Sequence, residues 1–361
     1  MIEIDASFGE GGGQIVRSSI ALAACTGTPL MLRNIRARRS KPGLRAQHLA
    51  AVRAITTICG ARVSGAATAS RTLSFVPGNV CPGRYSIDVG TAGSTMLVLQ
   101  TILPPLSLCS GPSEVILKGG THNPRAPTVE FVRDAYLPLL VRLGFKAEIA
   151  LEHHGFYPRG GGRIRASIEP FRPAGRFELC ERGPVHSRTA RALLAGLPPH
   201  IGQREIGVLR ARLGLPEDAC GVDTVSAAGA GNAVHVRIDC AHVSTVFAGF
   251  GIRGVPAEAV ASHLVFEVER YLAADVALDS YLADQLLLPL ALAGGGQFTT
   301  LKPSAHTDTN AAVIRAFLQV DYSARELGSD RWSITVLPTA SRVGMPEAKG
   351  SIAASGASLR S

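Results

Sequence analysis

Residues 14–60 read QIVRSSIALAACTGTPLMLRNIRARRSKPGLRAQHLAAVRAITTICG, and the pattern of this stretch decides the fold class. Apolar residues at helical spacing predict two helices, and a short apolar run between them predicts a strand. A polar loop rich in arginine separates the strand from the second helix. The expected elements are a helix at Gln14–Cys25, a strand at Leu30–Asn34, a loop at Ile35–Leu44 and a helix at Ala46–Ile58, followed by Gly60.

The same order of helix, strand, loop and helix occurs twice more in the chain. The second copy is expected as a helix from Ser94, a strand at Glu114–Leu117, a loop at Lys118–Pro127 and a helix at Val129–Leu143. The third is expected as a helix at Tyr281–Ala293, a strand at Gln297–Leu301, a loop at Lys302–Thr309 and a helix at Asn310–Leu318. This recurrence indicates an internal repeat. Because strands alternate with helices, the sequence favours an α/β (α+β) core.

A long segment separates the second copy from the third. It has alternating strand patterns at Ala233–Asp239 and Ser244–Gly249, and an amphipathic helix at Pro256–Leu272. The sequence therefore predicts a discontinuous large domain and a small inserted α/β domain between repeats 2 and 3. The expected boundaries are 1–181 and 275–340 for the large domain, 182–274 for the small one, and 342–361 for a loose tail rich in Gly, Ala and Ser.

The composition is that of an ordinary soluble globular protein, with 46% hydrophobic and 18% charged residues among 361. The start, MIEIDASFGEGGG, lacks the basic and then apolar run of an export signal. The apolar segments are shorter than the roughly 20 residues of a membrane span. The seven cysteines form no CxxC pair and no zinc-ligand spacing, so they are expected to be reduced thiols. These features predict a cytoplasmic protein with no membrane partner.

The formal charge of +9 is concentrated near the N-terminus, because residues 11–87 contain eleven Arg and Lys but no Asp or Glu. Clustered positive charge favours phosphate-rich partners such as nucleic acid. A basic surface with no such partner is the alternative. Within this region the loop IRARRSKPGLRAQH, residues 35–48, presents guanidinium groups suited to bidentate phosphate recognition.

Two further positions are candidates for chemistry. Glu10 stands in a glycine-rich turn before the first helix, where a carboxylate suits Mg²⁺ better than a phosphate, although a solvated turn is the alternative. His306 lies in the third of the equivalent loops, and neutral imidazole can act as a nucleophile near pH 7. Asp284 is the candidate partner for its other ring nitrogen. His122 and His48, in or beside the other two loops, are weaker rivals.

The sequence resembles the RNA 3′-terminal phosphate cyclase family up to about Ile334. The motifs that carry the resemblance are GEGGGQIVRSS, IRARRSKPGLRAQH, GTAGSTMLVLQT, HNPRAP, HGFYPRGGG, YLADQL and PSAHTDTN. The resemblance implies a fold of three βαβαββ-like repeats with a small domain inserted between the second and third. It also implies a ligase-type nucleotidyl transferase that uses ATP to convert RNA 3′-phosphates to 2′,3′-cyclic phosphates, through a histidine–AMP and an RNA(3′)ppA intermediate.

Residue roles follow from the matching motifs. The resemblance implies that His306 carries AMP, that Asp284 holds its imidazole, and that Glu10 helps to bind Mg²⁺ or Mn²⁺. ATP contacts are implied for Gln100, Pro127, Tyr281, Leu282, Ala283, Asp284 and Gln285, with Pro127 and Tyr281 sandwiching adenine. Phosphate and RNA contacts are implied for Arg17, Arg36, Arg39 and Gln47, of which Arg17 and Arg36 also assist catalysis. One departure is His122, which stands where some members have Asp.

Two other functions remain open at this point. A non-catalytic cyclase-like factor in rRNA processing would keep the fold, but such relatives match poorly at the nucleophile motif. An enolpyruvyl-type transferase would also need cationic side chains for an anionic substrate, but would form no protein–AMP adduct. The expected partners are ATP and RNA with a 3′-terminal phosphate; the oligomeric state is open, with a homodimer as one option.

Overall fold

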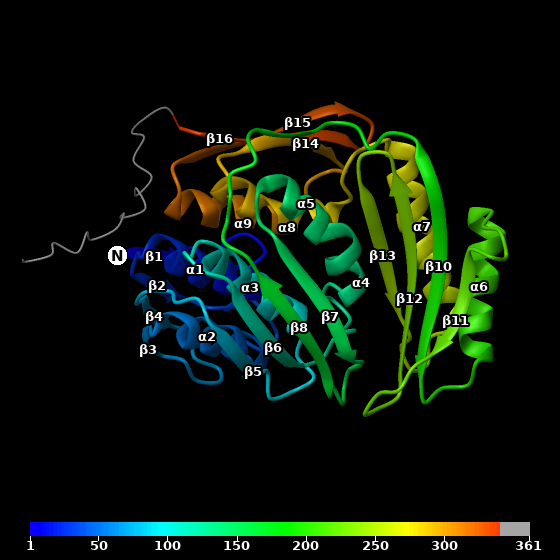
Figure 1. Cartoon of the computed structure of the whole chain (residues 1–361), viewed down its shortest axis with the longest axis horizontal. Helices are drawn as coiled ribbons and strands as arrows, with labels where there is room; N and C mark the ends of the chain where they lie inside the picture. Colours follow the sequence, from blue (N-terminus) through cyan, green and yellow to red (C-terminus); the bar gives the residue numbers. More distant parts are fainter. Residues whose placement is uncertain (340–361) are drawn as a thin grey trace, which may run out of the picture.

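The computed structural model describes residues 1–339, which form four sheets of four strands each with helices between them (Figure 1). The first sheet has the strand order β1-β2-β4-β3, in which β1 and β2 are parallel and β4 is antiparallel to both neighbours. Its elements are β1 (Ile2–Asp5), α1 (Gly13–Thr26), β2 (Leu30–Arg33), α2 (Ala46–Cys59), β3 (Arg62–Ser64) and β4 (Leu73–Val76). This run is a βαβαββ unit.

The second and third sheets repeat that unit with the same pairing, in the orders β5-β6-β8-β7 and β9-β14-β16-β15. The second unit comprises β5 (Arg84–Asp88), α3 (Thr95–Ser107), β6 (Ser113–Gly119), α4 (Val129–Phe131), the π-helical turn η1 (Val132–Tyr136), α5 (Leu137–Leu143), β7 (Ala147–His153) and β8 (Gly162–Ile168). The third comprises β9 (Phe177–Leu179), α8 (Ser280–Leu292), β14 (Gly296–Thr300), α9 (Ala305–Phe317), β15 (Val320–Gly328) and β16 (Arg331–Pro338). The mixed α/β fold class expected from the sequence is confirmed.

A fourth sheet, in the order β11-β10-β12-β13, is built from the segment between β9 and α8. Its elements are β10 (Val185–Ala195), α6 (His200–Leu213), β11 (Cys220–Thr224), β12 (Gly231–Cys240), β13 (Ser244–Phe250) and α7 (Ala257–Ala274). Because β9 already pairs with β14, this segment interrupts the third repeat after its first strand instead of lying between the second and third repeats. Strand β9 is short, and the inserted segment separates it in sequence from α8, so the sequence pattern did not identify it as the first strand of the third repeat.

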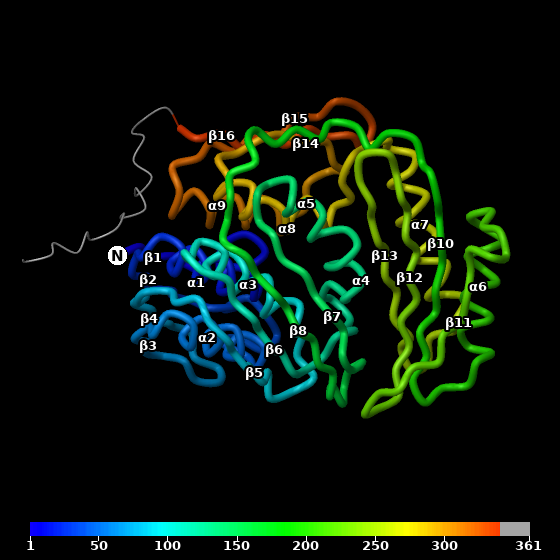
Figure 2. Tube along the Cα trace, in the orientation of Figure 1, coloured from blue at the N-terminus to red at the C-terminus, as the bar shows by residue number. Residues whose placement is uncertain are grey.

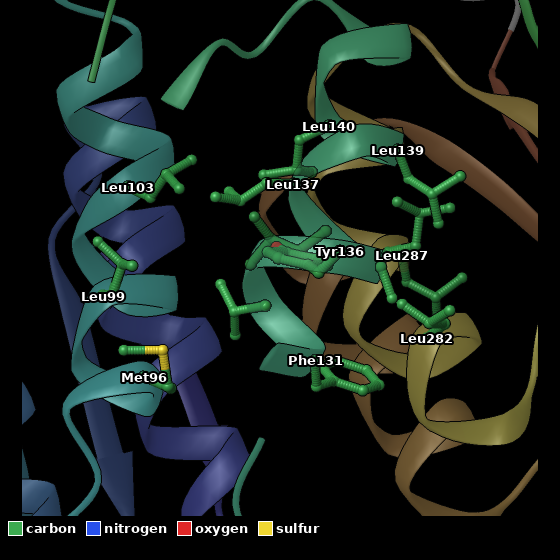
Figure 3. Close-up of a cluster of buried hydrophobic side chains, with 14 of the residues drawn as sticks. Met96, Leu99, Leu103, Phe131, Tyr136, Leu137, Leu139, Leu140, Leu282 and Leu287 are labelled. Carbon is green, nitrogen blue, oxygen red and sulfur yellow. The ribbon is translucent and has the colours of Figure 1, made fainter. Parts of the chain in front are cut away.

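The helices of the three repeats pack against one another in the interior. Figure 3 shows apolar side chains of α3, such as Leu99, facing Tyr136 and Leu137 at the junction of η1 and α5, with Leu287 of α8 beyond them. All four side chains are buried. Burial of large apolar side chains is the main favourable contribution to folding, so this shared core joins the repeats. Within residues 1–339, none of the helices combines the length and apolar character needed to cross a bilayer.

The third repeat differs from expectation at the segment predicted as a loop, Lys302–Thr309. Helix α9 begins at Ala305, so His306 lies in its first turn. The Ser304 side chain accepts a hydrogen bond from the Thr307 backbone, while the Thr307 hydroxyl accepts one from the Ser304 backbone. Backbone N–H groups at the start of a helix have no partner within the helix, and this capping box supplies side-chain acceptors for two of them. The prediction of a helix from Asn310 was therefore five residues late.

The arginine-rich loop 35–44 is held in place by a close approach of two backbone segments. Gly43 has φ +75°, and a β-carbon added to it would lie 2.2 Å from the carbonyl oxygen of Ala69. The backbone of the adjacent Leu44 donates to Ser70 and accepts from Ala69. Gly27, which ends α1, also has positive φ, at +65°, but an added β-carbon there would contact nothing within 4 Å.

We expect Gly43→Ala to destabilise the protein much more than Gly27→Ala. Both changes impose left-handed backbone on an L-residue, which costs about 1–2 kcal/mol. Gly43→Ala also pushes the backbone at Ala69 aside, so its total loss is expected to be about 3 kcal/mol or more. Urea unfolding followed by circular dichroism measures both variants. Equal losses would show that the contact between Gly43 and Ala69 does not constrain the loop.

Helix α2 begins with a buried histidine. The Nδ1 atom of His48 accepts a hydrogen bond from the Arg45 backbone N–H, at 3.0 Å. Burial, with the nearby charges of Arg17, Arg36 and Arg45, lowers the pKa of His48 to about 3. The ring is therefore neutral in the folded protein over the whole range in which an exposed histidine titrates.

This depressed pKa predicts a loss of stability in mild acid. Below its ordinary pKa of 6.5, His48 gains a proton in the unfolded chain but not in the folded one, so acid favours unfolding. Between pH 7 and pH 5 the residue should lower the free energy of unfolding by about 2 kcal/mol. His48→Asn should show a correspondingly smaller change in urea unfolding across that range, whereas replacing the exposed His263 by Asn should not. Parallel pH profiles for wild type and His48→Asn would contradict this assignment.

Candidate active site

His306 stands at the point where the third repeat meets the first. Its side chain is 51% exposed, in the first turn of α9. Its Nδ1 atom lies 3.0 Å from Oε1 of Gln14, in the first turn of α1. Because an amide oxygen only accepts hydrogen bonds, this contact requires a proton on Nδ1 of the ring.

Gln14 is in turn oriented by Asp284 of α8. The amide nitrogen of Gln14 donates to both carboxylate oxygens of Asp284, at 2.9 and 3.0 Å. This bond directs the amide oxygen toward His306, and so leaves the lone pair of the neutral imidazole on Nε2. Asp284 was expected to hold the ring itself, but Gln14 lies between the two and makes the hydrogen bond to the ring.

Opposing effects act on the pKa of Asp284. Burial raises the pKa of Asp284, while the Gln14 hydrogen bond and the charges of His306 and Arg17 act in the opposite direction. Burial also lowers the pKa of Arg17 to about 10, with Asp284 acting against that shift. Asn310 of α9 donates to the Asp284 backbone oxygen at 3.0 Å, which links α8 to α9. The charge effects that Arg17 and Asp284 exert on each other's pKa values show that the guanidinium lies near this carboxylate.

The opposite nitrogen of His306 faces Glu10. The Nε2 atom lies 3.7 Å from a carboxylate oxygen of Glu10, whose side chain is 15% exposed and is paired with Arg39. Arg39 also donates to the backbone oxygen of Glu10 at 2.9 Å. The Glu10 backbone donates to Thr309 of α9 at 2.9 Å, so the glycine-rich turn is fastened to the same helix as His306.

Two other residues expected on the phosphate side are engaged with backbone. The Arg36 guanidinium donates to the carbonyl oxygens of Lys41 and Gly43, at 2.7 and 3.2 Å, and so stabilises its own loop. Gln47 bonds the Ser94 backbone at both ends, accepting from its N–H at 2.6 Å and donating to its oxygen at 3.1 Å. Gln47 thereby connects the first repeat to the start of α3.

The expected ATP-binding residues fall into exposed and buried groups. Tyr281 is 55% exposed, and its hydroxyl donates to Glu267 at 2.9 Å. Gln100 and Gln285 are bonded to each other across α3 and α8. Pro127 is half-buried. Leu282 and Ala283 point into the core, so only their backbone could contact a nucleotide. Nucleotide contacts for this group stay predictions.

The rival histidines are both buried. His48 is 7% exposed and serves the start of α2, whereas His122 is 1% exposed and lies 3.0 Å from the Glu130 carboxylate. The sequence reasoning missed the role of Gln14, although it lies inside the quoted motif GEGGGQIVRSS, because a glutamine carries no catalytic signal by itself. It also missed Glu130 and its neighbour His235, because no short spacing joins them.

Comparisons with known proteins agree with these motifs. Residues 8–324 match the family model described as RNA 3′-terminal phosphate cyclase. A protein of that name from Koribacter versatilis (strain Ellin345) is 44% identical over 346 residues, covering 96% of this chain and 97% of the relative. Another from Salmonella enteritidis PT4 (strain P125109) is 46% identical over 323 residues, covering 90% of this chain and 95% of the relative.

A solved structure, the enolpyruvyl transferase NikO from Streptomyces tendae, is 12% identical, with a TM-score of 0.35 over 92% of this chain and 47% of that one. That likeness is too low to support an argument. The match of the family model over most of the chain and the identity to relatives along nearly their whole length both point to one assignment. The chain belongs to the RNA 3′-terminal phosphate cyclase family.

Proposed function

We propose that the protein converts an RNA 3′-phosphate to a 2′,3′-cyclic phosphate in the cytoplasm, using ATP and a covalent AMP on Nε2 of His306. The observation that carries the proposal is the bonded series from Asp284 through Gln14 to Nδ1 of His306. It holds the imidazole with its reactive nitrogen directed away from the core. The family assignment supports the RNA substrate.

In the first step Nε2 of His306 attacks the α-phosphorus of ATP, a P–N bond forms, and the bond to the β-phosphate breaks to release pyrophosphate. The ring keeps its proton on Nδ1, so the adduct is an imidazolium that carries a positive charge. Asp284 can stabilise that charge through the Gln14 amide. The same positive charge makes the ring a good leaving group in the next step.

In the second step an oxygen of the RNA 3′-phosphate attacks the AMP phosphorus and breaks the P–N bond, which restores His306 and yields RNA(3′)ppA. The adjacent 2′-hydroxyl then attacks the 3′-phosphorus and gives its proton to water, while the bond from that phosphorus to the AMP oxygen breaks and AMP leaves. The ribose holds this hydroxyl next to its target, so proximity lowers the barrier to ring closure. Arg17 lies near Asp284 and Arg39 pairs with Glu10, and in this proposal both guanidinium groups neutralise phosphate charge.

The divalent metal expected with ATP would be held by Glu10. A single carboxylate beside the nucleophile fits Mg²⁺ or Mn²⁺, which is bound through one or two carboxylates together with substrate phosphates. Such a metal supplies charge stabilisation at the phosphates. Because Glu10 is paired with Arg39, metal binding at Glu10 would compete with that ion pair.

The proposal predicts that wild-type protein incubated with ATP labelled at the α-phosphate and Mg²⁺ retains label after denaturation, whereas His306→Ala does not. The label is lost because no other described group has the same exposed, tautomerically fixed nitrogen beside Glu10. Gel electrophoresis and autoradiography of the denatured chain measure the adduct.

The matched control is His263→Ala, which removes an exposed histidine on α7 and should label like wild type. Absence of label in wild type, with folding verified by circular dichroism, would overturn the proposal. It would favour the non-catalytic factor or the enolpyruvyl-type transferase.

The intermediate position of Gln14 predicts that Gln14→Ala slows adduct formation more than about tenfold without abolishing it, because the ring loses its orienting partner but keeps its nucleophile. Single-turnover labelling at saturating ATP measures this rate. Asp284→Asn should slow the same step, since a neutral amide cannot offset the imidazolium charge.

Gln203→Ala, which removes an exposed glutamine on α6, is the control and should leave the rate unchanged. The readout that separates positioning from folding is the concentration of ATP at half-maximal rate, which should change little in Gln14→Ala. A wild-type labelling rate in Gln14→Ala would refute the role of the amide.

A further inference from the structure

A second cluster of titratable side chains lies where the inserted sheet meets the second repeat. His122 from the loop after β6 faces His235 of β12, with ring centroids 5.9 Å apart in an edge arrangement. Glu130 of α4 lies between them: a carboxylate oxygen is 3.0 Å from Nε2 of His122, and 3.4 Å from Nε2 of His235. Figure 1 shows α4 beside the inserted sheet, in which β12 lies between β10 and β13.

Hydrogen bonds within the second repeat orient the ring of His122. The Thr121 hydroxyl donates to the Gly155 oxygen at 3.3 Å and accepts from the Gly155 N–H at 2.9 Å. The same hydroxyl lies 2.9 Å from Nδ1 of His122 and orients the ring. Its Nε2 atom is thereby directed at the Glu130 carboxylate. A ring nitrogen and a carboxylate oxygen at this distance can both be ligands of one cation.

His235 approaches the same carboxylate from the inserted sheet. Its side chain is 5% exposed, and its buried Nε2 atom has no hydrogen-bond partner among the described residues. A buried polar nitrogen that makes no hydrogen bond costs free energy unless another ligand satisfies it. The unpartnered nitrogen points toward the same carboxylate.

The spacing of the three ligand atoms suits a small divalent ion. All three lie within 4.8 Å of one another. In a tetrahedral site with bonds of 2.0–2.1 Å, neighbouring ligand atoms are about 3.3 Å apart. The measured separations of 3.0 and 3.4 Å from Glu130 straddle that value. Two imidazoles and one carboxylate favour a borderline transition metal over Mg²⁺ or Ca²⁺, which prefer oxygen ligands.

We propose that His122, Glu130 and His235 bind one divalent transition-metal ion, of which Zn²⁺ is the best fit, at the junction of the second repeat and the inserted sheet. The Thr121 hydroxyl orients the His122 ring, as outer partners of metal ligands do. The ion joins β12 to α4, and a fourth position remains for water. This site is separate from Glu10, and has no part in the proposed AMP transfer.

The test is the zinc content of the intact protein. Purified chain is stripped with a chelator, dialysed against Zn²⁺ and then against metal-free buffer, and analysed by mass spectrometry of the metal. Wild type and His306→Ala should each retain about one zinc per chain. His235→Ala and Glu130→Gln should lose at least about tenfold in affinity. The control His154→Ala, which removes a ring stacked on His122 at 5.5 Å, should retain the ion.

A variant in which one metal ligand is replaced by another separates loss of the site from misfolding, because such a variant should still bind the metal. In His235→Cys loaded with Co²⁺, a thiolate ligand should add a sulfur-to-cobalt charge-transfer band that Co²⁺-loaded wild type lacks. No zinc in folded wild type would overturn the proposal, and would indicate that a proton occupies the space between the rings and Glu130. Equal zinc in wild type, His235→Ala and Glu130→Gln would also overturn it, because the metal would then reside elsewhere, such as on the cysteines.

Discussion

The site depends on one carboxylate that lies between helices, that of Asp284, whose negative charge must be offset by nearby donors or positive groups. Burying an ionised carboxylate without partners is costly, so its surroundings must supply donors or positive charge. Gln14 and Arg17 from α1 supply them, and Asn310 from α9 fixes the backbone at the same point. These contacts bind α1, α8 and α9 together, and they also orient His306. Stability and the proposed chemistry therefore depend on the same interaction.

The repeated unit explains how residues so distant in sequence meet. Helices of the three βαβαββ units pack together in one apolar core, in which Figure 3 shows side chains of α3, of the segment from α4 to α5, and of α8 (Figures 2 and 3). The turn before α1 carries Glu10, and the capped start of α9 carries His306. Close packing of α1 against α9 brings these two ends together, because neither helix can shift without opening voids in the core.

Buried polar side chains also lie where the inserted segment meets the second repeat. Its strands form a sheet with the pairing of the other three, but its central strand β12 carries a buried histidine instead of an apolar side chain. The facing α4 carries Glu130, at the start of a helix interrupted by the π-helical turn η1. An interface that buries two imidazoles and a carboxylate is polar by construction, and a polar interface is stable only when every such atom has a partner.

The sequence by itself determined the repeat, the inner helices and the nucleophile candidate, because periodicity and short motifs are local properties. Residues 14–60 were sufficient to predict α1, β2 and α2 nearly to the residue. The start of α9 was misjudged, since the capping serine was read as part of a loop. The predicted tail at 342–361 lies outside the described residues.

Only the tertiary structure decided that Gln14 stands between His306 and Asp284, that β9 belongs to the third sheet, and that His235 faces Glu130. Each of these contacts joins residues more than a hundred positions apart. No local pattern records such a distance, because it is set by how complete units pack against one another.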